Sequence, residues 1–500
     1  MAQLAVEKPF PPGEYPVVVV GSGPGGLQAS YALRRLGIEH ALISQDDSPG
    51  GMFRKWPVFG RLLSWTKADA PYDRRAREYE WFDHNSLVAD EPENRGLAAE
   101  FIDRTWMVPT VPEMTANLQA FAERTGTAVR LECRWEGTRF EEEGFVLETT
   151  DGEYRCKVAV FAIGVTDPLK TPIPGIEEVP HYVDVRRDKE SYRGKRVVVI
   201  GKRNSGFELA DGLVPWASQV FLVSPRPVAA EVIALSTVRA RYLQPYEDWS
   251  WGGGTFAVDA AIDRIERTAG GGYRILASGT TREGPIVLEA DEAIAATGFR
   301  TPMRDLAGLG CATVKQGVLP AQTHHWESAT VPGIYFAGNA TQAAAGLRKH
   351  GVASASGTVS GFRYNSRLLA AHIGEKHFGI ERPRPSLAVD DVAPLLVSEV
   401  ARSPELWSQK SYFVRVVSRG DDGGAVDEGY QPLAAFLDEG GADAIAVTVE
   451  MNGSGEIYPA AYLRRNGGVE EDTRPPQALN EFEGEGYRAY IGDHVRRTLG

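Results

Sequence analysis

The most regular hydrophobic pattern in the chain is a run of four consecutive valines, Val17–Val20. Because the run is short, β-branched and apolar at every position, it predicts a fully buried strand of a parallel sheet. Gly21, Gly23 and Gly26 follow at once, and a helical pattern then continues to about Leu36. A strand, a glycine turn and a helix in this order predict a dinucleotide-binding βαβ unit.

The glycines of this turn each have a physical purpose. Gly21 permits the tight turn, Gly23 lets the backbone approach a pyrophosphate, and Gly26 lets the helix lie close on the strand. The helix N-terminus then offers unpaired amides and the positive end of a dipole to the phosphates. The residues expected to bind this first nucleotide are Gly21, Ser22, Gly23, Pro24, Gly25 and Gly26.

A second strand is predicted at residues 40–44, and its end is where such folds carry an acidic residue for a ribose hydroxyl. Ser44 and Gln45 stand there instead, and either side chain can still hydrogen-bond a ribose. A further glycine turn contains Gly51 and Met52. It either lets the backbone lie close to a flat ring or is a plain surface turn.

The opening pattern occurs a second time near residue 200. Arg196–Ile200 is another valine-rich strand, and the turn at 201–206 leads into a helix from about Phe207. A strand at 219–223 then ends close to Arg226. An arginine there suits the 2′-phosphate of NADPH, whereas an acidic residue would favour NADH; a solvated loop arginine is the alternative. Two such units predict two nucleotides facing each other.

Shorter patterns between and after these units predict further elements. A helix is expected at 113–125, and strands are expected at 128–133, 144–149, 157–162, 291–296 and 333–337, with a helical region ending near His372. Pro168, Pro172 and Pro174 mark a crossing between domains. From about Glu381 the composition changes, and Pro383 with Asp390-Asp391 reads as a linker to a separate solvated module.

Composition narrows the function classes. The chain has 500 residues, 43% of them hydrophobic, and a formal charge of −13, of which −7 falls within residues 401–500. This length predicts several domains, and the acidic balance argues against nucleic acid or an anionic membrane as partner. Three cysteines without a C-x-x-C pair, and the absence of a signal-peptide core, favour a cytoplasmic location. Nothing in the sequence indicates the oligomeric state.

The glycine turn at 21–26 and three later motifs, Ala162-Ile163-Gly164, Ala296-Thr297-Gly298 and Tyr335–Asn339, resemble those of the two-dinucleotide-fold flavoproteins. The resemblance implies an α/β fold with two Rossmann-like domains, the NADPH fold inserted in the FAD fold, and a small α+β C-terminal module. It implies an FAD-binding domain at 1–170 and 292–385, an NAD(P)H-binding domain at 171–291, and the module at 386–500. FAD is then expected on the first turn and on Ser44, Gln45, Gly51, Met52, Trp65, Ala162, Gly164, Gly338 and Asn339. NADPH is expected on Gly201, Arg203, Asn204, Ser205, Gly206, Arg226, Thr297 and Gly298.

Within that class, Asn204-Ser205-Gly206 looks like the NADPH turn of flavin-containing monooxygenases. Arg203 replaces the usual second glycine, so it either pairs with phosphate or weakens nicotinamide binding. The runs at 63–67, 82–87 and 361–364 are similar to FAD-dependent-oxidoreductase-domain proteins.

The resemblance implies a monooxygenase that adds one oxygen from dioxygen to a small-molecule N, S or carbonyl centre through a flavin C4a-hydroperoxide. Asn85 is then the candidate hydrogen-bond donor beside the flavin; a turn asparagine that satisfies backbone groups is the alternative. A reductase of a non-disulfide acceptor is a second hypothesis, and a flavoprotein that binds partners through its C-terminal module is a third. Disulfide reduction is disfavoured, because the related reductases carry a cysteine where this chain has Gly25.

Two other features have simpler interpretations. His324-His325 could indicate a metal, but no carboxylate or cysteine stands at ligand spacing, so a solvated loop and no metal site are predicted. Trp249 and Trp251 could form a mobile lid, although loop packing is the safer interpretation.

Overall fold

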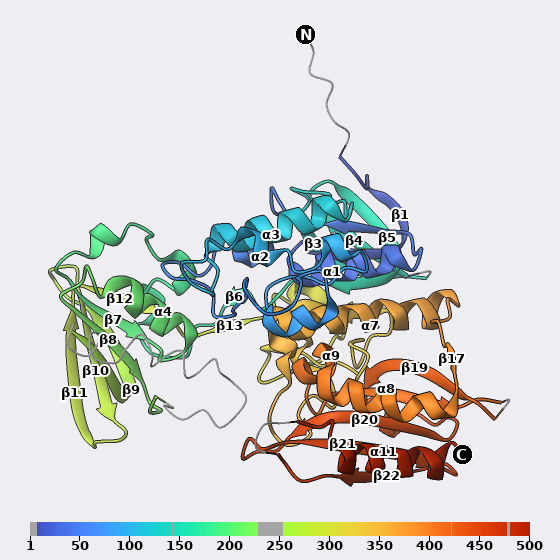
Figure 1. The fold of residues 1–500 in the computed structure, drawn as a ribbon. Coiled ribbons are helices and arrows are strands. Elements are labelled where there is room, and N and C mark those ends of the chain that lie inside the picture. Colours follow the sequence, from blue (N-terminus) through green and yellow to red (C-terminus); the bar gives the residue numbers. More distant parts are fainter. Residues whose placement is uncertain (1–7, 143, 229–253, 422, 478–480) are drawn as a thin grey trace.

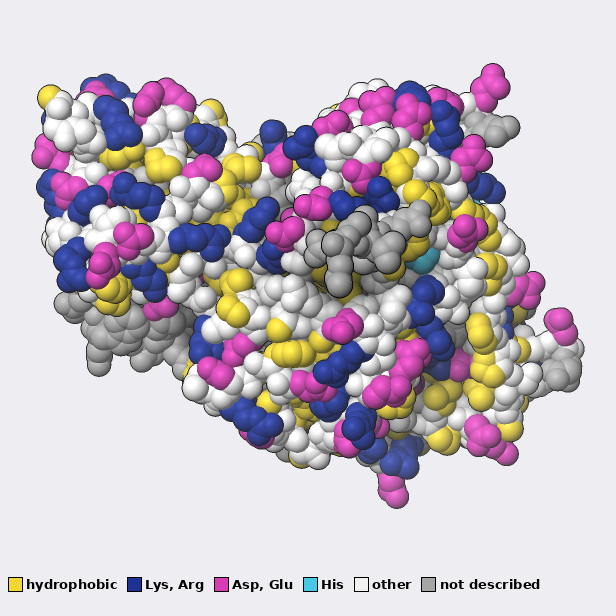
Figure 2. Space-filling model, turned by 90° about the horizontal axis from the view of Figure 1, so that it is seen from above, with side chains coloured by type: hydrophobic (Ala, Val, Ile, Leu, Met, Phe, Trp, Pro, Cys, Tyr) yellow, Lys and Arg dark blue, Asp and Glu magenta, His cyan; other side chains and the backbone are white. Residues whose placement is uncertain are grey.

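The computed structural model describes residues 8–142, 144–228, 254–421, 423–477 and 481–500 (Figure 1). The two tryptophans of the predicted lid, Trp249 and Trp251, lie outside the described residues. Three six-stranded sheets form the body of the protein. The second sheet belongs to a separate unit, which forms the lobe on the left in Figures 1 and 2. Figure 2 shows Lys/Arg and Asp/Glu side chains interspersed over the visible face.

The first sheet contains strands that come before the second nucleotide-binding unit in the sequence and one strand, β16, that comes after it. Its order is β2-β1-β5-β4-β3, and β16 pairs with β5. β1, β2, β5 and β16 run parallel. Val17 and Val19 face one hydrophobic core while Val18 and Val20 face the other, as expected for a strand buried on both sides. The bounds are β1 (Gly13–Val20), β2 (His40–Ile43), β3 (Trp135–Glu141), β4 (Gly144–Thr149), β5 (Gly152–Phe161), β16 (Ile334–Phe336), α1 (Pro24–Arg35), α2 (Ala98–Phe101), α3 (Val111–Arg124) and α7 (Val359–Phe378).

The second sheet repeats the parallel βαβ arrangement. β12, β7, β8 and β9 are parallel neighbours, and β9-β10-β11 form an antiparallel extension. Two short strands, β6 (Asp167–Pro168) and β13 (Phe299–Arg300), pair where the chain crosses between the two units. The bounds are β7 (Arg196–Ile200), β8 (Gln219–Ser224), β9 (Thr255–Arg267), β10 (Tyr273–Gly279), β11 (Gly284–Ala290), β12 (Glu292–Ala295) and α4 (Asn204–Leu213), with a small pair β14 (Thr313–Val314) and β15 (Leu319–Pro320) further on.

The C-terminal residues form an antiparallel sheet in the order β17-β19-β18-β20-β21-β22. Its helices α8 and α11 pack on one another, and α10 lies against β18 and β19. The expected α/β architecture with two Rossmann-like units and an α+β C-terminal part is therefore confirmed, while the domain boundaries stay predictions. The bounds are β17 (Ser386–Leu387), β18 (Phe413–Arg419), β19 (Ala425–Pro432), β20 (Ala444–Met451), β21 (Ile457–Arg465), β22 (Gly468–Thr473), α8 (Val389–Arg402), α9 (Pro404–Ser408), α10 (Leu433–Asp438) and α11 (Glu485–Thr498).

The C-terminal part is not separate from the first unit, contrary to the expectation. One hydrophobic core includes residues of α1 and α7 as well as residues of α8, α9 and α11. Arg77 of the first unit pairs with Glu405 at 2.7 Å and with Glu399 at 3.3 Å. Asp390-Asp391, expected in a linker, instead lie in the first turn of α8, where carboxylates stabilise a helix N-terminus.

Two local predictions also differ from the structure. Residues 128–133 form no strand: Arg130 makes an isolated bridge to Ile43, and a few further backbone hydrogen bonds join the segment to residues 42–46. The strand starts at Trp135, where β4 offers a partner. Glu132 has a positive φ of 56°, which interrupts an extended backbone. α4 begins at Asn204 rather than near Phe207, so residues 204–206 of the predicted turn already belong to the helix.

Candidate active site

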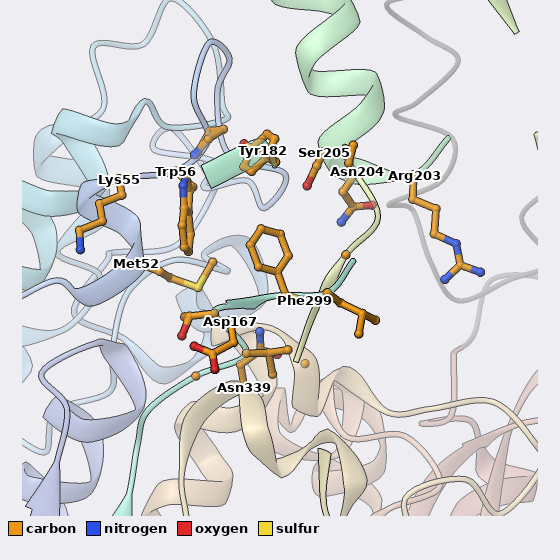
Figure 3. Close-up of a pocket in the computed structure, with 18 of the residues that line it drawn as sticks. Met52, Lys55, Trp56, Asp167, Tyr182, Arg203, Asn204, Ser205, Phe299 and Asn339 are labelled. Atoms are coloured by element: carbon orange, nitrogen blue, oxygen red, sulfur yellow. The ribbon is translucent and has the colours of Figure 1, made fainter. Parts of the chain in front are cut away.

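A cavity of about 1590 Å³ joins the two nucleotide folds. The C-terminal ends of β1 and β2 open into it from the first fold, and those of β7 and β8 open into it from the second. Figure 3 shows Asn204 and Ser205 at the start of α4 on one side of this space and Asn339 on the other, with Phe299 between them. Ligands of α/β sheets bind at such strand ends, so the cavity is the candidate active site.

Most of the residues singled out in the sequence line this cavity. Those that do are Gly21, Ser22, Gly23, Pro24, Gly25, Ser44, Gln45, Gly51, Met52, Asn85, Ala162, Gly164, Gly201, Arg203, Asn204, Ser205, Arg226, Thr297, Gly298, Gly338 and Asn339. Gly26, Gly206 and Trp65 are not among the lining residues.

The two turns are built alike at atomic detail. Gly21 and Gly201 both have positive φ. A Cβ on Gly21 would lie 2.5 Å from the carbonyl oxygen of Ala162, and a Cβ on Gly201 would lie 2.3 Å from that of Ala296. Each alanine directly follows the neighbouring strand of its sheet. A Cβ on Gly26 or Gly206 would meet the first glycine of its own turn at 1.8 or 2.3 Å. Gly26 and Gly206 therefore allow the helix to contact the turn directly, and this explains why they are packed against the turn and do not line the cavity.

Backbone from two other segments, those of Gly51 and Gly338, closes around the first turn. A Cβ on Gly25 would lie 2.4 Å from Cα of Gly338, and a Cβ on Gly51 would lie 2.9 Å from Cα of Gly23. α1 has no acidic residue in its first turn to compete for the helix N-terminus. Such a bare, close-packed backbone cradle at a helix start fits the pyrophosphate of FAD.

The ribose end of the first fold carries hydroxyls in place of an acid. Ser22 Oγ donates to Ser44 Oγ at 2.8 Å, and both side chains are buried. Asp46, immediately beyond the expected pair, also lines the cavity. These groups can hydrogen-bond the adenosine half of the nucleotide.

Asn85 lines the cavity but is already heavily bonded. Its Nδ2 donates to Ser64 O at 3.2 Å and to Thr66 Oγ1 at 3.0 Å, so both amide hydrogens have partners. Donation to a flavin-bound group would require one of these bonds to break. Trp65, in contrast, does not line the cavity; its ring lies tilted against His84, with a centroid separation of 3.9 Å.

A buried arginine that sequence reasoning gave no role holds the Asn85 loop. Arg363 of α7 is 1% exposed and donates to the carbonyl oxygens of Asp83 and Ser86, both at 2.9 Å, and of Glu80 at 3.1 Å. Asp83 in turn accepts from the backbone N–H of Asn85 at 3.0 Å. In the sequence this arginine stands between Phe362 and Tyr364, within the run at 361–364.

The second fold carries two arginines suited to a phosphate. Arg203 and Arg226 line the cavity, are exposed, and form no ion pair with another described residue. Figure 3 shows the Arg203 side chain directed away from the space between Met52 and Phe299. Lys202 was missed and differs from both: its Nζ donates to Val258 O at 2.9 Å and pairs with Asp259, so its charge is already matched.

The junction of the folds has an aromatic wall that the sequence did not reveal. The ring centroids of Trp56 and Phe299 are 5.3 Å apart, and Tyr182 meets Phe299 edge-on at 6.0 Å. Glu208 of α4 joins this wall to the second fold, accepting from Gly60 N and Tyr182 Oη at 2.8 Å each. Burial raises the pKa of the Glu208 carboxyl above its ordinary value.

The sequence model of the pyridine nucleotide-disulphide oxidoreductase family matches residues 18–338. The chain belongs to this family. This membership makes it an FAD-dependent oxidoreductase, and the cofactor pair expected from the sequence, FAD and NADPH, agrees with it. Residues 386–500 lie beyond the matched part.

Relatives of this oxidoreductase differ in activity. The chain is 30% identical over 216 residues to FAD-dependent oxidoreductase domain-containing protein 2 of Danio rerio; the matched segment covers 42% of this chain and 31% of the relative. It is 28% identical over 221 residues to monooxygenase aurF of Gibberella zeae, 41% of this chain and 38% of the relative. The chain thus matches about a third of the length of these relatives. Ferredoxin–NADP reductases are also among the relatives.

A flavin monooxygenase from Stenotrophomonas maltophilia has a similar structure, with a TM-score of 0.55 and 18% identity over 72% of this chain and 98% of the other. That likeness concerns the fold. In the described part of the chain, no helix has both the length and the apolar character needed to cross a membrane.

Proposed function

We propose that this oxidoreductase is an NADPH-dependent flavin monooxygenase that transfers one oxygen atom from dioxygen to a small-molecule N, S or carbonyl centre. FAD would lie on the first glycine turn and NADPH on the second, at opposite ends of the shared cavity. FAD supplies the redox and oxygen chemistry when bound, and the chain supplies positioning and exclusion of water.

The observation that favours the proposal over disulfide reduction is the absence of a thiol relay among the described residues, which include all three cysteines. Each is buried and none forms a disulfide. Cys133 lines the cavity, but its backbone N–H bonds Ser44 O at 2.8 Å, which places it at the ribose end, and burial raises the pKa of its thiol. At Gly25, any side chain would collide with the Gly338 backbone. Disulfide chemistry therefore has no residue to use.

The walls suit oxygen chemistry, which needs a dry site rather than a strong acid or base. Met52, Trp56, Phe299 and Phe362 give the cavity apolar and aromatic surface. The 28% identity to a named monooxygenase supports the same conclusion.

A reductase of a non-disulfide acceptor is the second candidate, because ferredoxin–NADP reductases are among the relatives. The test is a screen of amines, thioethers and ketones for substrate-dependent NADPH consumption under ¹⁸O₂. The proposal expects one ¹⁸O atom in the product for each NADPH oxidised. Rapid NADPH oxidation by artificial acceptors, with no ¹⁸O in any product and all oxygen recovered as hydrogen peroxide or water, would identify a reductase.

A further inference from the structure

A group of three metal-ligating side chains lies away from the cofactor cavity: His324, His325 and Glu439. Nε2 of His324 is 2.9 Å and Nε2 of His325 is 3.0 Å from the same oxygen, Oε1 of Glu439. The three ligand atoms lie within 4.8 Å of one another. The imidazoles are mostly buried, with 19% and 16% of their side chains exposed, whereas 54% of the Glu439 side chain is exposed. An ion can thus enter from the carboxylate side.

We propose that His324, His325 and Glu439 form a binding site for a divalent transition-metal ion, with Zn²⁺ as the best match. Zinc binds histidine nitrogen and carboxylate oxygen at about 2.0–2.2 Å, so the donors of a tetrahedral ion lie about 3.3 Å apart. The nitrogen–oxygen distances of 2.9 and 3.0 Å need only a small opening to reach this spacing. Two nitrogens and one oxygen leave a fourth position for water.

Both segments that carry the ligands are fixed by other contacts. The His325 ring stacks on His372 of α7 with a centroid separation of 4.0 Å, and the next residue, Trp326, is fully buried. Glu439 ends α10: its N–H donates to Ala435 O at 2.9 Å. A site that is held before the ion arrives loses little ordering entropy on binding.

The ion would join two parts of the chain. His324 and His325 precede β16 of the first sheet, whereas Glu439 lies 114 residues after His325 and follows α10 of the C-terminal part. Metal binding should therefore stabilise the contact between these parts. It should not change the flavin chemistry directly, because none of the three residues lines the cofactor cavity.

The test uses the full-length flavoprotein after treatment with a chelator. Zn²⁺ is titrated in competition with a chromophoric chelator, and Co²⁺ is added separately to record its visible spectrum. Glu439→Gln keeps the shape of the half-exposed carboxylate, and His324→Ala removes one nitrogen. Asp472→Asn is the matched control, since Asp472 accepts from a single histidine, His494, at 3.0 Å elsewhere in the C-terminal part.

We expect one Zn²⁺ per chain, a thermal midpoint that rises with bound metal, and a Co²⁺ spectrum of a four-coordinate site. Glu439→Gln and His324→Ala should each weaken Zn²⁺ binding by roughly 100-fold, and Asp472→Asn should not. Equal flavin content in all variants shows that each is folded. Substoichiometric binding, or affinity that is unchanged in both ligand variants, would overturn the proposal and leave a hydrogen-bonded His–Glu–His group. Monooxygenase or reductase activity does not enter this test, so it stands apart from the proposed function.

Discussion

Removal of the Arg363 side chain should release the loop that carries Asn85. Arg363→Met keeps much of the side-chain volume but removes the hydrogen bonds to three backbone carbonyls and the 3.0 Å bond to Tyr364 Oη. All of these groups are buried. Unpartnered buried acceptors and the loss of a bonded buried charge together cost about 3–5 kcal/mol.

The assay is the temperature at which flavin fluorescence is released from the protein. A loss of about 3–5 kcal/mol corresponds to a drop of about 6–10 °C for a domain of this size. Arg367→Met is the matched control on the same helix, because Arg367 is 38% exposed and pairs with Asp90 at 2.8 Å. An exposed pair contributes about 0–1 kcal/mol, so this variant should stay within about 2 °C of the wild type.

If Arg363→Met released flavin at the wild-type temperature, the loop at 80–86 would not depend on the arginine. The inference that α7 positions the Asn85 side of the cavity would then be wrong.

Three further substitutions test other parts of the account. Gly25→Ala should abolish flavin binding, measured as the flavin-to-protein ratio, because the new Cβ would lie 2.4 Å from Cα of Gly338. The control is Gly270→Ala, whose Cβ would meet nothing within 4 Å and which should bind flavin normally. Arg226→Ala should raise KM for NADPH by about 10- to 100-fold with little effect on KM for NADH. The control is Arg264→Ala, which changes an arginine paired with an exposed glutamate on β9 and should alter neither KM. An unchanged NADPH/NADH preference in Arg226→Ala would remove the phosphate assignment. Burial raises the pKa of Glu208 in the folded protein above its ordinary value of 4.5, so the folded state binds more protons than the unfolded state above that pH. The wild type therefore loses stability as the pH rises from about 4.5 through the folded-state pKa. Glu208→Gln should therefore gain thermal stability relative to the wild type between pH 4.5 and 8, and a constant difference across this range would contradict the raised pKa.

The sequence predicted the nucleotide folds well because their constraints are local. A buried valine strand, a glycine that must adopt positive φ, and a helix start follow one another within about ten residues, so Gly21 and Gly201 could be assigned without tertiary information. The close fit of Gly26 and Gly206 against their turns follows from the same local geometry.

Features that depend on distant contacts could not be predicted in this way. The strand expected at 128–133 lies instead at Trp135–Glu141, since pairing with β4 decides its position. The partly buried pairing of Arg77 with Glu399 of α8 and Glu405 of α9 joins residues more than 300 positions apart. It links the acidic C-terminal part to the first unit. Glu439 reaches His324 and His325 only through the tertiary fold, which is why the histidine pair had no visible carboxylate partner.

The central claim is that one chain holds FAD and NADPH in a shared cavity so that hydride passes from the nicotinamide to the flavin. The most direct measurement is anaerobic stopped-flow absorbance of the purified protein mixed with NADPH or NADH. The account predicts a yellow protein whose flavin band bleaches, faster with NADPH than with NADH, and returns when air is admitted. A protein that takes up no flavin, or a bound flavin that neither nucleotide reduces, would contradict it.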